Sequence, residues 1–305
     1  MKVEVMPDVR NLPPLIALSK MLQSFRQTLW ERGFIELPTA LIHEHDACPI
    51  FQRVRLEDGR YLKESGGLAL RCNLAHAPKI FEVAQCARKD SIDPSHLQQF
   101  TMLDLYDAEA TIANAISLCK ELVTSVYHGP VKTCSVAAHI QETIGVDLFN
   151  DPECEANLKT SLARRYDNPN ATLFSLVNSY MTREIEPLSK NCLVIVTDVP
   201  RAAESAGRQK PGSFGVANIA EIQIDCMEVA QIIEDEPDTE SYLERAKLHG
   251  HYGPEVELVV DEIRQGRIPS QSAGFGIGLE RLAMVATGRH DIQAFMPSRN
   301  FIREL

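Results

Sequence analysis

The sequence predicts an α+β fold, in which a mainly antiparallel sheet of about six or more strands is flanked by helices. Three observations lead to this prediction. Helix-like and strand-like segments are mixed rather than strictly alternating, two apolar runs are joined by a polar loop, and no internal repeat is present. A chain of 305 residues with 44% hydrophobic residues can bury a large core.

The first half of the chain supplies a helix, a strand and a hairpin. Apolar residues recur at helical spacing between Leu15 and Arg32, and Gly33 ends that pattern. The strand-like segment "FIELPTALI" follows. Residues 81–106 contain two apolar runs around "KDSIDPSHLQ", a loop-forming segment, and therefore predict an antiparallel hairpin with a long tip.

The second half adds helices and buried strands. Helical spacing returns from Thr111 to about Tyr180, and "NCLVIVTDV" at 191–199 reads as a buried strand before a polar loop. The remaining segments are a strand-like region, two helices and a final strand-to-helix unit, at residues 217–233, 239–250, 254–266 and 272–288.

Charge and cysteine content narrow the classes of protein. The net charge of -11 argues against an extended nucleic-acid surface, so we expect no DNA partner. The eight cysteines form no C-x-x-C pair, which favours a reduced, cytoplasmic protein without a zinc site or disulfide framework. No stretch approaches the roughly 20 apolar residues of a membrane span, so no membrane partner is expected.

The segment "SAGFGIGLERLAMVATG" at 272–288 places three alternating glycines before a helix that opens with Glu280 and Arg281. This spacing is not the G-x-G-x-x-G of dinucleotide-binding proteins. Taken alone, the glycines predict either tight packing of a strand against a helix or close approach of a ligand to the backbone.

The hairpin at 81–106 favours the ligand. Arg88 and Asp90 end its first strand, His96 lies in its loop, and Phe100 begins the return strand. These residue types suit a nucleotide triphosphate: Arg for the α-phosphate, His for the outer phosphates and Phe for the face of the base. We therefore expect ATP here.

Three motifs in order resemble the catalytic domain of class II aminoacyl-tRNA synthetases of the aspartyl, asparaginyl and lysyl subgroup. "ERGFIELPTALI" with Pro38 resembles the first motif, and "FEVAQCARKD" with "HLQQFTMLD" resembles the second. "GFGIGLERLAM" followed by "AFMPSR" resembles the third. The resemblance spans roughly residues 15–302 and implies a single catalytic domain over 1–305 with the antiparallel sheet of that class.

The resemblance also implies roles for individual residues. The first motif forms a dimer in this family, so a homodimer is expected. Gly276 and Gly278 would let the backbone approach ATP, and Arg281 would lie over the adenine and sandwich it against Phe100.

Glu221 and Glu228 match the two acidic positions that hold Mg²⁺ in aspartyl- and lysyl-type enzymes. Hard oxygen ligands bridged to substrate phosphates suit this ion. The alternative is an acidic strand on the surface. Because seven residues separate them, the two carboxylates would face opposite sides of a regular strand, so the site requires a bulge or turn in "QIDCM".

The resemblance breaks at the amino-acid pocket. Glu44 matches the carboxylate that the subgroup keeps for the substrate ammonium. Gly67 and Ala69 replace the usual Gln and Tyr, Gln99 replaces a Glu, and Gln231 replaces a small or amide residue. With Gly274 of the glycine segment, these positions predict an amino-acid pocket whose substrate is an amino acid other than Asp, Asn and Lys, or a modified form of one of them.

The first helix begins near residue 15, which leaves no room before it for the N-terminal barrel, on the order of 100 residues, that reads the anticodon in the subgroup. We therefore expect a stand-alone ligase that forms an aminoacyl-adenylate and passes it to ammonia, an amine or a protein. Two alternatives stay open: a tRNA-charging enzyme that reads only the acceptor stem, and a catalytically silent sensor of nucleotide or amino acid.

Overall fold

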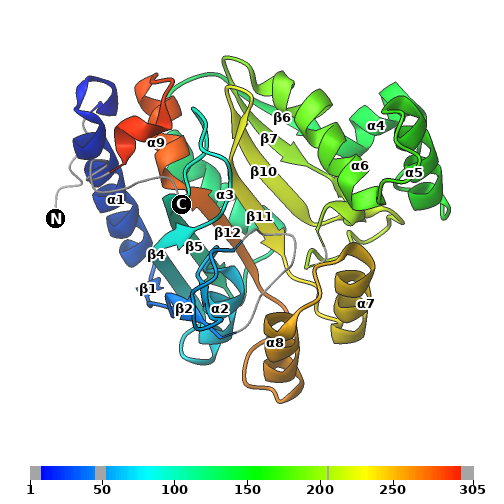
Figure 1. Ribbon diagram of the computed structural model, residues 1–305, viewed down its shortest axis with the longest axis horizontal. Helices are drawn as coiled ribbons and strands as arrows, with labels where there is room; N and C mark the ends of the chain where they lie inside the picture. The colour runs from blue at the N-terminus through cyan, green and yellow to red at the C-terminus, as the bar shows by residue number, and fades with distance from the viewer. Residues whose placement is uncertain (1–7, 45–52, 205, 297–305) are drawn as a thin grey trace.

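The computed structural model of the chain describes residues 8–44, 53–204 and 206–296. Within these residues, eight strands form one sheet in the order β1-β4-β5-β12-β11-β10-β7-β6. The six strands β4, β5, β12, β11, β10 and β7 pair antiparallel with one another. The edge strands β1 and β6 pair parallel with β4 and β7. The predicted α+β fold with an antiparallel sheet flanked by helices is confirmed (Figure 1). The strands are β1 (Ile35–Glu36), β4 (Lys79–Ala87), β5 (Gln99–Asp107), β6 (Val131–Ser135), β7 (Leu193–Thr197), β10 (Ile219–Ile224), β11 (Met227–Glu234) and β12 (Ala273–Gly278).

The predicted hairpin is formed by β4 and β5, which pair continuously from Lys79 with Asp107 to Ala87 with Gln99. The polar loop between them supplies the turn. Strand β12, which carries the alternating glycines, pairs with β5 on one side and β11 on the other. Two segments far apart in sequence, each selected for its motif, thus lie side by side.

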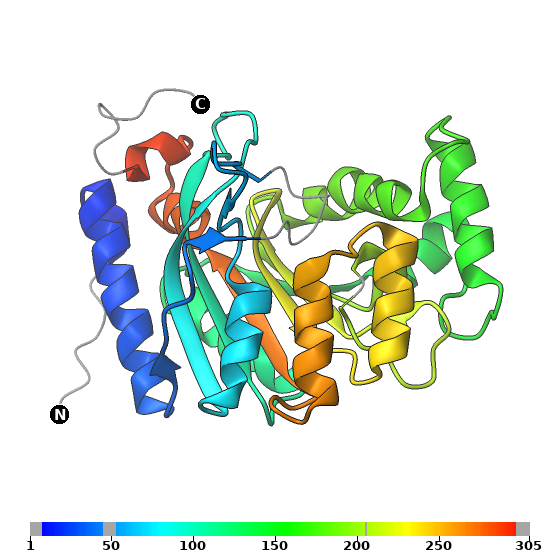
Figure 2. The same ribbon diagram turned by 60° about the horizontal axis from the view of Figure 1, so that its bottom comes forward.

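The two faces of the sheet differ because side chains alternate along each strand. Leu103 and Leu105 of β5, together with Phe275 and Ile277 of β12, point into the main hydrophobic core. Helices α1, α3 and α9 pack against this face and add to that core, as do strands β4, β7, β10 and β11. The residues between them in sequence face the other side, where α2, α7 and α8 lie (Figure 2).

The helices follow the predicted boundaries closely at both ends of the chain. Helix α1 begins at Pro14, buries Leu18, Phe25 and Leu29, and ends before Gly33, whose positive φ of 81° suits a residue without a side chain. The helices are α1 (Pro14–Glu31), α2 (Gly67–Cys72), α3 (Ile112–Thr124), α4 (Val136–Ile144), α5 (Cys154–Arg165), α6 (Leu173–Tyr180), α7 (Thr239–His249), α8 (Pro254–Arg264) and α9 (Leu279–Thr287).

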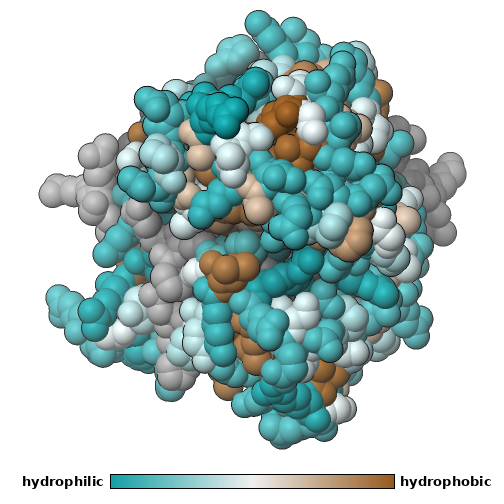
Figure 3. All heavy atoms as spheres, turned by 90° about the vertical axis from the view of Figure 1, so that its right-hand side faces the viewer, coloured by the Kyte–Doolittle hydropathy of each residue, from teal (hydrophilic) through white to brown (hydrophobic). Residues whose placement is uncertain are grey.

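The region from Thr111 to Tyr180 contains a strand that helical spacing does not predict. β6 follows Gly129 and Pro130 and is mostly exposed, so its residues carry no alternating apolar pattern. Helices α4, α5 and α6 then pack around a core of their own. The side of the molecule on which α5 and α7 lie is mostly hydrophilic, with apolar side chains in small separate groups (Figure 3).

The predicted strand "FIELPTALI" is only partly in the sheet. Ile35 and Glu36 pair with β4, and the chain then leaves the sheet at Pro38, which has no N–H to donate to a ladder. Ile42 and His43 form a short separate pair, β2 (Ile42–His43), with β3 (Tyr61–Leu62). A second short pair joins β8 (Val199–Pro200) to β9 (Val216–Ala217).

Among the described residues, no helix combines the length and apolar character that crossing a bilayer requires.

Candidate active site

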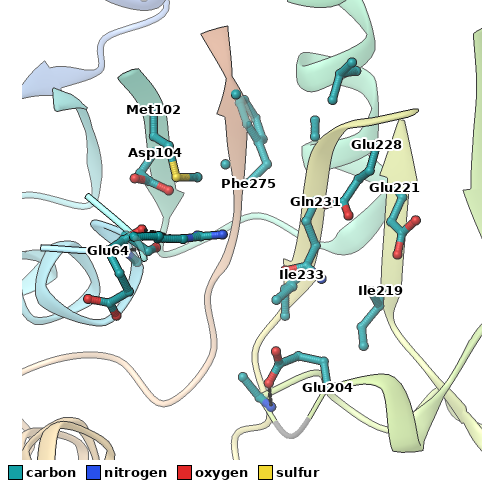
Figure 4. A pocket seen from close by; sticks show the side chains of 18 of the residues that line it. Glu64, Met102, Asp104, Glu204, Ile219, Glu221, Glu228, Gln231, Ile233 and Phe275 are labelled. Carbon is teal, nitrogen blue, oxygen red and sulfur yellow. Dashed lines mark hydrogen bonds between the residues drawn. The ribbon is translucent and has the colours of Figure 1, made fainter. Parts of the chain in front are cut away.

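A cavity of about 620 Å³ lies on the second face of the sheet, between strands β5, β12, β11 and β10 and helices α2, α6, α7 and α8 (Figure 4). Most residues predicted for the site line it. They are Gly67, Arg88, Asp90, His96, Phe100, Glu221, Glu228, Gln231, Gly274, Gly276, Gly278 and Arg281.

Strand pairing arranges the floor of this cavity in three rows. The first row contains Met102 paired with Gly278 and Gln223 paired with Glu228. The middle row contains Asp104, Gly276, Gln231 and Glu221. The far row contains Tyr106, Gly274, Ile233 and Ile219. Along a regular strand, successive rows are two residues apart, or about 7 Å.

Arg88 follows β4 and reaches the first row. Its Nε donates a hydrogen bond to the carbonyl of Glu64 at 3.1 Å, and its guanidinium carbon lies 5.1 Å from the centroid of the Phe100 ring. The cation over Phe100 in this structure is therefore Arg88, not Arg281. An adenine between Phe100 and Arg281 requires the other face of the ring, or movement of Arg88 towards a phosphate.

Arg281 lies in the first turn of α9 and joins two parts of the cavity wall. Its Nε donates to the carbonyl of Ser95 and its Nη1 donates to the carbonyl of Glu228, both at 3.1 Å. His96, beside Ser95, has its Nδ1 2.8 Å from Asp93. The β4–β5 loop thus stands over one end of the cavity, which is the end where the sequence analysis expects the phosphates.

Glu280, next to Arg281, has a structural role. Its carboxylate accepts hydrogen bonds from the backbone N–H of Thr101 at 2.8 Å and from the Thr101 hydroxyl at 2.7 Å. These bonds tie α9 to the start of β5 and hold Arg281 in position against the loop.

The three alternating glycines serve different purposes. A Cβ on Gly274 would lie 2.2 Å from the carbonyl oxygen of Leu105, and one on Gly276 would lie 2.9 Å from a carboxylate oxygen of Asp104. A Cβ on Gly278 would meet nothing closer than 3.8 Å. Tight packing within the protein therefore accounts for the first two, and Gly278 is the one of the three at which a Cβ would make only ordinary contacts.

The turn that the sequence predicts between Glu221 and Glu228 is present. Asp225 and Cys226, both with positive φ, reverse the chain between β10 and β11. Gln223 pairs with Glu228 across this turn, and the register then shifts, so that Ile222 pairs with Ala230 and Val229 has no partner on β10. Because Gln223 lies two residues from Glu221 and directly opposite Glu228, both carboxylates face the cavity.

Glu221 and Glu228 carry like charges in a site shielded from solvent, so the two carboxylates repel each other. Burial, with the nearby charge of Glu228, raises the pKa of Glu221 to about 8, and burial also raises the pKa of Glu228. The amide of Gln223 donates to Glu221 at 2.7 Å, and the buried Oε1 of Gln223 has no donor. This oxygen-rich donor set fits Mg²⁺, which takes one or two carboxylates and completes its shell with phosphate and water oxygens.

Glu221 and Glu228 do not make a complete metal site by themselves. Across residues 8–44, 53–204 and 206–296, no group of three or more His, Cys, Asp or Glu side chains is arranged to hold a metal. The pair is therefore expected to bind Mg²⁺ together with nucleotide phosphates.

Asp104 is a cavity residue that the sequence analysis did not select for the site. It is 4% exposed and accepts a hydrogen bond from the N–H of Gly66 at 3.1 Å. Burial, and then the charge of Glu82, raise the pKa of Asp104 to about 6. A signal was available: Asp104 is four residues from Phe100 on one strand, so both side chains face the cavity.

Two predicted substrate residues do not reach the cavity. Glu44 is exposed at the end of β2, away from the sheet that forms the floor. Gln99 precedes Phe100, so it points to the opposite side of β5, where its amide donates to Gln85 at 3.0 Å. The structure therefore corrects both assignments, whereas Asp104 is a buried carboxylate that does line the cavity.

Gly67 and Ala69, at the start of α2, leave the cavity wide. A Cβ on Gly67 would lie 3.5 Å from the Ser65 hydroxyl and 4.0 Å from the Tyr106 hydroxyl, which are ordinary contacts. A larger side chain at position 67 would occupy cavity space, as the pocket differences in the sequence predict.

An antiparallel sheet with a nucleotide-binding hairpin, a glycine strand leading into an arginine-bearing helix and a paired-glutamate hairpin defines the catalytic domain of a class II aminoacyl-tRNA synthetase. The chain belongs to this family: the model of tRNA synthetases class II (D, K and N) matches residues 9–297.

Individual relatives share about a quarter of their residues with the chain. A lysine–tRNA ligase from Thermotoga sp. (strain RQ2) is 24% identical over 91% of this chain and 61% of its own length. Lysine–tRNA ligases from Carboxydothermus hydrogenoformans and Saccharolobus solfataricus are 23% and 24% identical, over 95% and 91% of this chain and 65% and 62% of their own lengths. The chain thus spans less than two thirds of these curated relatives.

Proposed function

We propose that this chain is an AMP-forming ligase that uses ATP and Mg²⁺ to activate an amino acid, or an amino-acid-like carboxylate, to an acyl-adenylate. The observation that carries the proposal is the arrangement of charges along one cavity. Arg88 and Arg281 lie at one end with Glu228 of the first row, and Glu221 and Asp104 lie at opposite sides of the middle row, on β10 and β5. These groups suit a triphosphate, its metal ion and a substrate ammonium.

The proposed step needs no protein nucleophile. A carboxylate oxygen of the substrate attacks the α-phosphorus, a new P–O bond forms, and the bond to the β-phosphate oxygen breaks to release pyrophosphate. Arg88 would neutralise charge on the reacting phosphate, and Arg281 would hold the adenine end. Bound Mg²⁺ would supply further neutralisation of phosphate charge at Glu221 and Glu228.

The acceptor of the acyl group is proposed to be ammonia, an amine or a protein rather than tRNA. The net charge of -11 disfavours a large polyanionic partner. The relatives are named as tRNA ligases, so tRNA charging is the second candidate. A gel shift and an aminoacylation assay with bulk tRNA separate the two: tRNA binding with charging at salt near 0.15 M would establish the second candidate.

ATP–pyrophosphate exchange with a panel of amino acids tests activation itself. Exchange should occur with at least one amino acid and should be almost abolished in Arg88→Ala, since that charge acts on the reacting phosphate. Tight ATP binding without exchange for any amino acid would instead support a silent sensor.

A homodimer through α1 and β1 is part of the proposal. Leu15, Ile16 and Trp30 on α1 and Ile35 on β1 are 43–51% exposed, which is a high exposure for large apolar side chains. Sedimentation as a monomer at micromolar concentration would contradict the dimer.

A further inference from the structure

The cavity continues beyond the far row, past the place where an adenylate and a substrate ammonium would lie. The walls of this extension, here called the distal end, come from the helical segments and the loop before β9. The distal end is lined by Phe174, Val199, Glu204, Ala206, Tyr242 and His251. Figure 4 shows the sequence of surfaces: Glu228 and Glu221, then Ile233 and Ile219, then Glu204.

The approach to the distal end is apolar. In the far row, Ile219 and Ile233 pair across β10 and β11, and Gly274 beside them presents no side chain. Val199 and Ala206 continue this surface. A ligand group that crosses this row therefore gains by burying hydrocarbon and would lose by burying an unpaired polar atom.

The distal end itself is polar and held in place. His251 Nδ1 lies 3.3 Å from Glu204 Oε1, and the same oxygen accepts from the backbone N–H of Ala206 at 3.1 Å. The Phe174 ring packs edge-on to the imidazole, with centroids 4.9 Å apart. His251 is 7% exposed although it borders the cavity, so its orientation is fixed by packing.

The charge of the distal end selects against an acidic ligand. Among the described residues that line the cavity beyond the far row, none is Lys or Arg, and Glu204 carries a carboxylate. A ligand carboxylate would meet this charge at close range, whereas an amine or amide N–H could donate to Glu204 or to an unprotonated imidazole nitrogen.

His251 and Glu204 are too far from the reacting phosphate to act as acid or base there. The first and far rows are four residues apart on β10, or about 13 Å, and the pair lies beyond the far row. A general base must come within about 3 Å of the proton it removes, or act through one water. Recognition, rather than proton transfer, is the role left to them.

We infer that the activated amino acid carries a long side chain, apolar along its middle, that crosses Ile219 and Ile233 and places a nitrogen-bearing, hydrogen-bond-donating tip against Glu204 and His251. The inference rests on the proposed activation. The span of about 7 Å from the middle row to the far row corresponds to about five or six carbon–carbon bonds, since each bond of about 1.5 Å advances an extended chain by slightly less than its length. Lysine, with five bonds from Cα to Nζ, therefore only reaches the far row, whereas Glu204 and His251 lie beyond it (Figure 4). The substrate is thus longer than unmodified lysine or has a lysine side chain extended at its amino group.

ATP–pyrophosphate exchange with four synthetic amino acids tests the inference. The probes are lysine, Nε-acetyl-lysine, Nε-glycyl-lysine and 2-aminooctanoic acid, which is long but has no polar tip. We expect kcat/KM for Nε-glycyl-lysine or Nε-acetyl-lysine to exceed that for lysine and for 2-aminooctanoic acid at least tenfold.

Two substitutions test whether the distal end recognises the tip of the substrate side chain. Glu204→Leu should reduce the preference for the tipped probes over 2-aminooctanoic acid at least tenfold, and Ala206→Leu, which fills the distal end, should reduce the preference for all three long probes over lysine. Glu240→Gln, on the exposed side of α7, is the matched control and should keep wild-type preferences. Melting temperatures of the variants verify that each is folded.

The outcomes separate the two proposals. A wild-type preference for lysine or 2-aminooctanoic acid that neither substitution changes overturns this inference and leaves activation standing. Tight ATP binding with no exchange for any probe or any standard amino acid overturns activation, and this inference with it.

Discussion

Replacing Glu221 with Gln should stabilise the ligand-free protein at alkaline pH. The pKa of Glu221 is raised from 4.5 to about 8 by burial and by the charge of Glu228. Below pH 4.5 the carboxyl is protonated in both the folded and the unfolded chain and costs nothing. Between pH 4.5 and about 8 only the unfolded chain releases its proton, so the free energy of unfolding falls as pH rises.

The size of this effect follows from the two pKa values. Each pH unit between them corresponds to about 1.4 kcal/mol, which gives an upper limit of about 5 kcal/mol above pH 8. Glu228 shares the repulsion, so removing one charge relieves it for the other as well. Since Gln at position 221 still accepts the hydrogen bond from Gln223, we expect a gain of about 2–3 kcal/mol at pH 8.5 and almost none at pH 4.5.

Urea unfolding from pH 4.5 to 8.5, in the presence of a chelator, measures this prediction. The difference in free energy of unfolding between Glu221→Gln and wild type should rise steadily with pH, and the same difference for Glu240→Gln should stay flat. MgCl₂ with ATP should then stabilise the wild type more than the variant at pH 8.5. A difference that is independent of pH, or that falls as pH rises, would refute a buried, repelling pair.

Further predictions concern the cavity floor and its arginine. Arg281→Ala should weaken ATP binding by roughly 1–3 kcal/mol with little change in melting temperature, as measured by calorimetry, because its guanidinium is expected to lie on the adenine; unchanged affinity would place the adenine elsewhere. Asp104→Asn should raise KM for the amino acid and remove a rise in its binding between about pH 5 and 7, since the pKa of Asp104 is about 6 and only the ionised form attracts an ammonium. Gly274→Ala should destabilise the fold by more than about 2 kcal/mol because its Cβ would overlap the Leu105 carbonyl, whereas Gly278→Ala should cost less than about 1 kcal/mol in the same urea assay.

The end of the cavity at which we expect the phosphates could be located from sequence because its residues lie in short, continuous motifs. Arg88, His96 and Phe100 occur within one hairpin, whose alternating pattern gives both the strands and the loop. The turn between Glu221 and Glu228 could also be predicted, since two residues seven apart face opposite sides of one regular strand but share a face across a two-residue hairpin turn.

The other end of the cavity could not be predicted because its walls come from segments that have no common motif. Phe174, Glu204 and His251 lie on different elements, and only tertiary packing brings them together. Glu44 was assigned by its place in a motif. The chain leaves the main sheet at Pro38, however, and β2, which precedes Glu44, lies in a separate pair with β3 away from the cavity. Local pattern reports which way a residue points along its own strand, and not where an irregular connection leads.

The extra residue on β11, Val229, lets Glu228 and Gln231 both border the cavity although three positions separate them in sequence. Deleting Val229 would leave Gln223 opposite Glu228 and Ile222 opposite Ala230, which are successive pairs of a regular antiparallel ladder. Such a chain would keep Glu221 and Glu228 on the same face of the sheet. A one-residue gap at this position in an alignment of related sequences is therefore compatible with a retained pair of carboxylates.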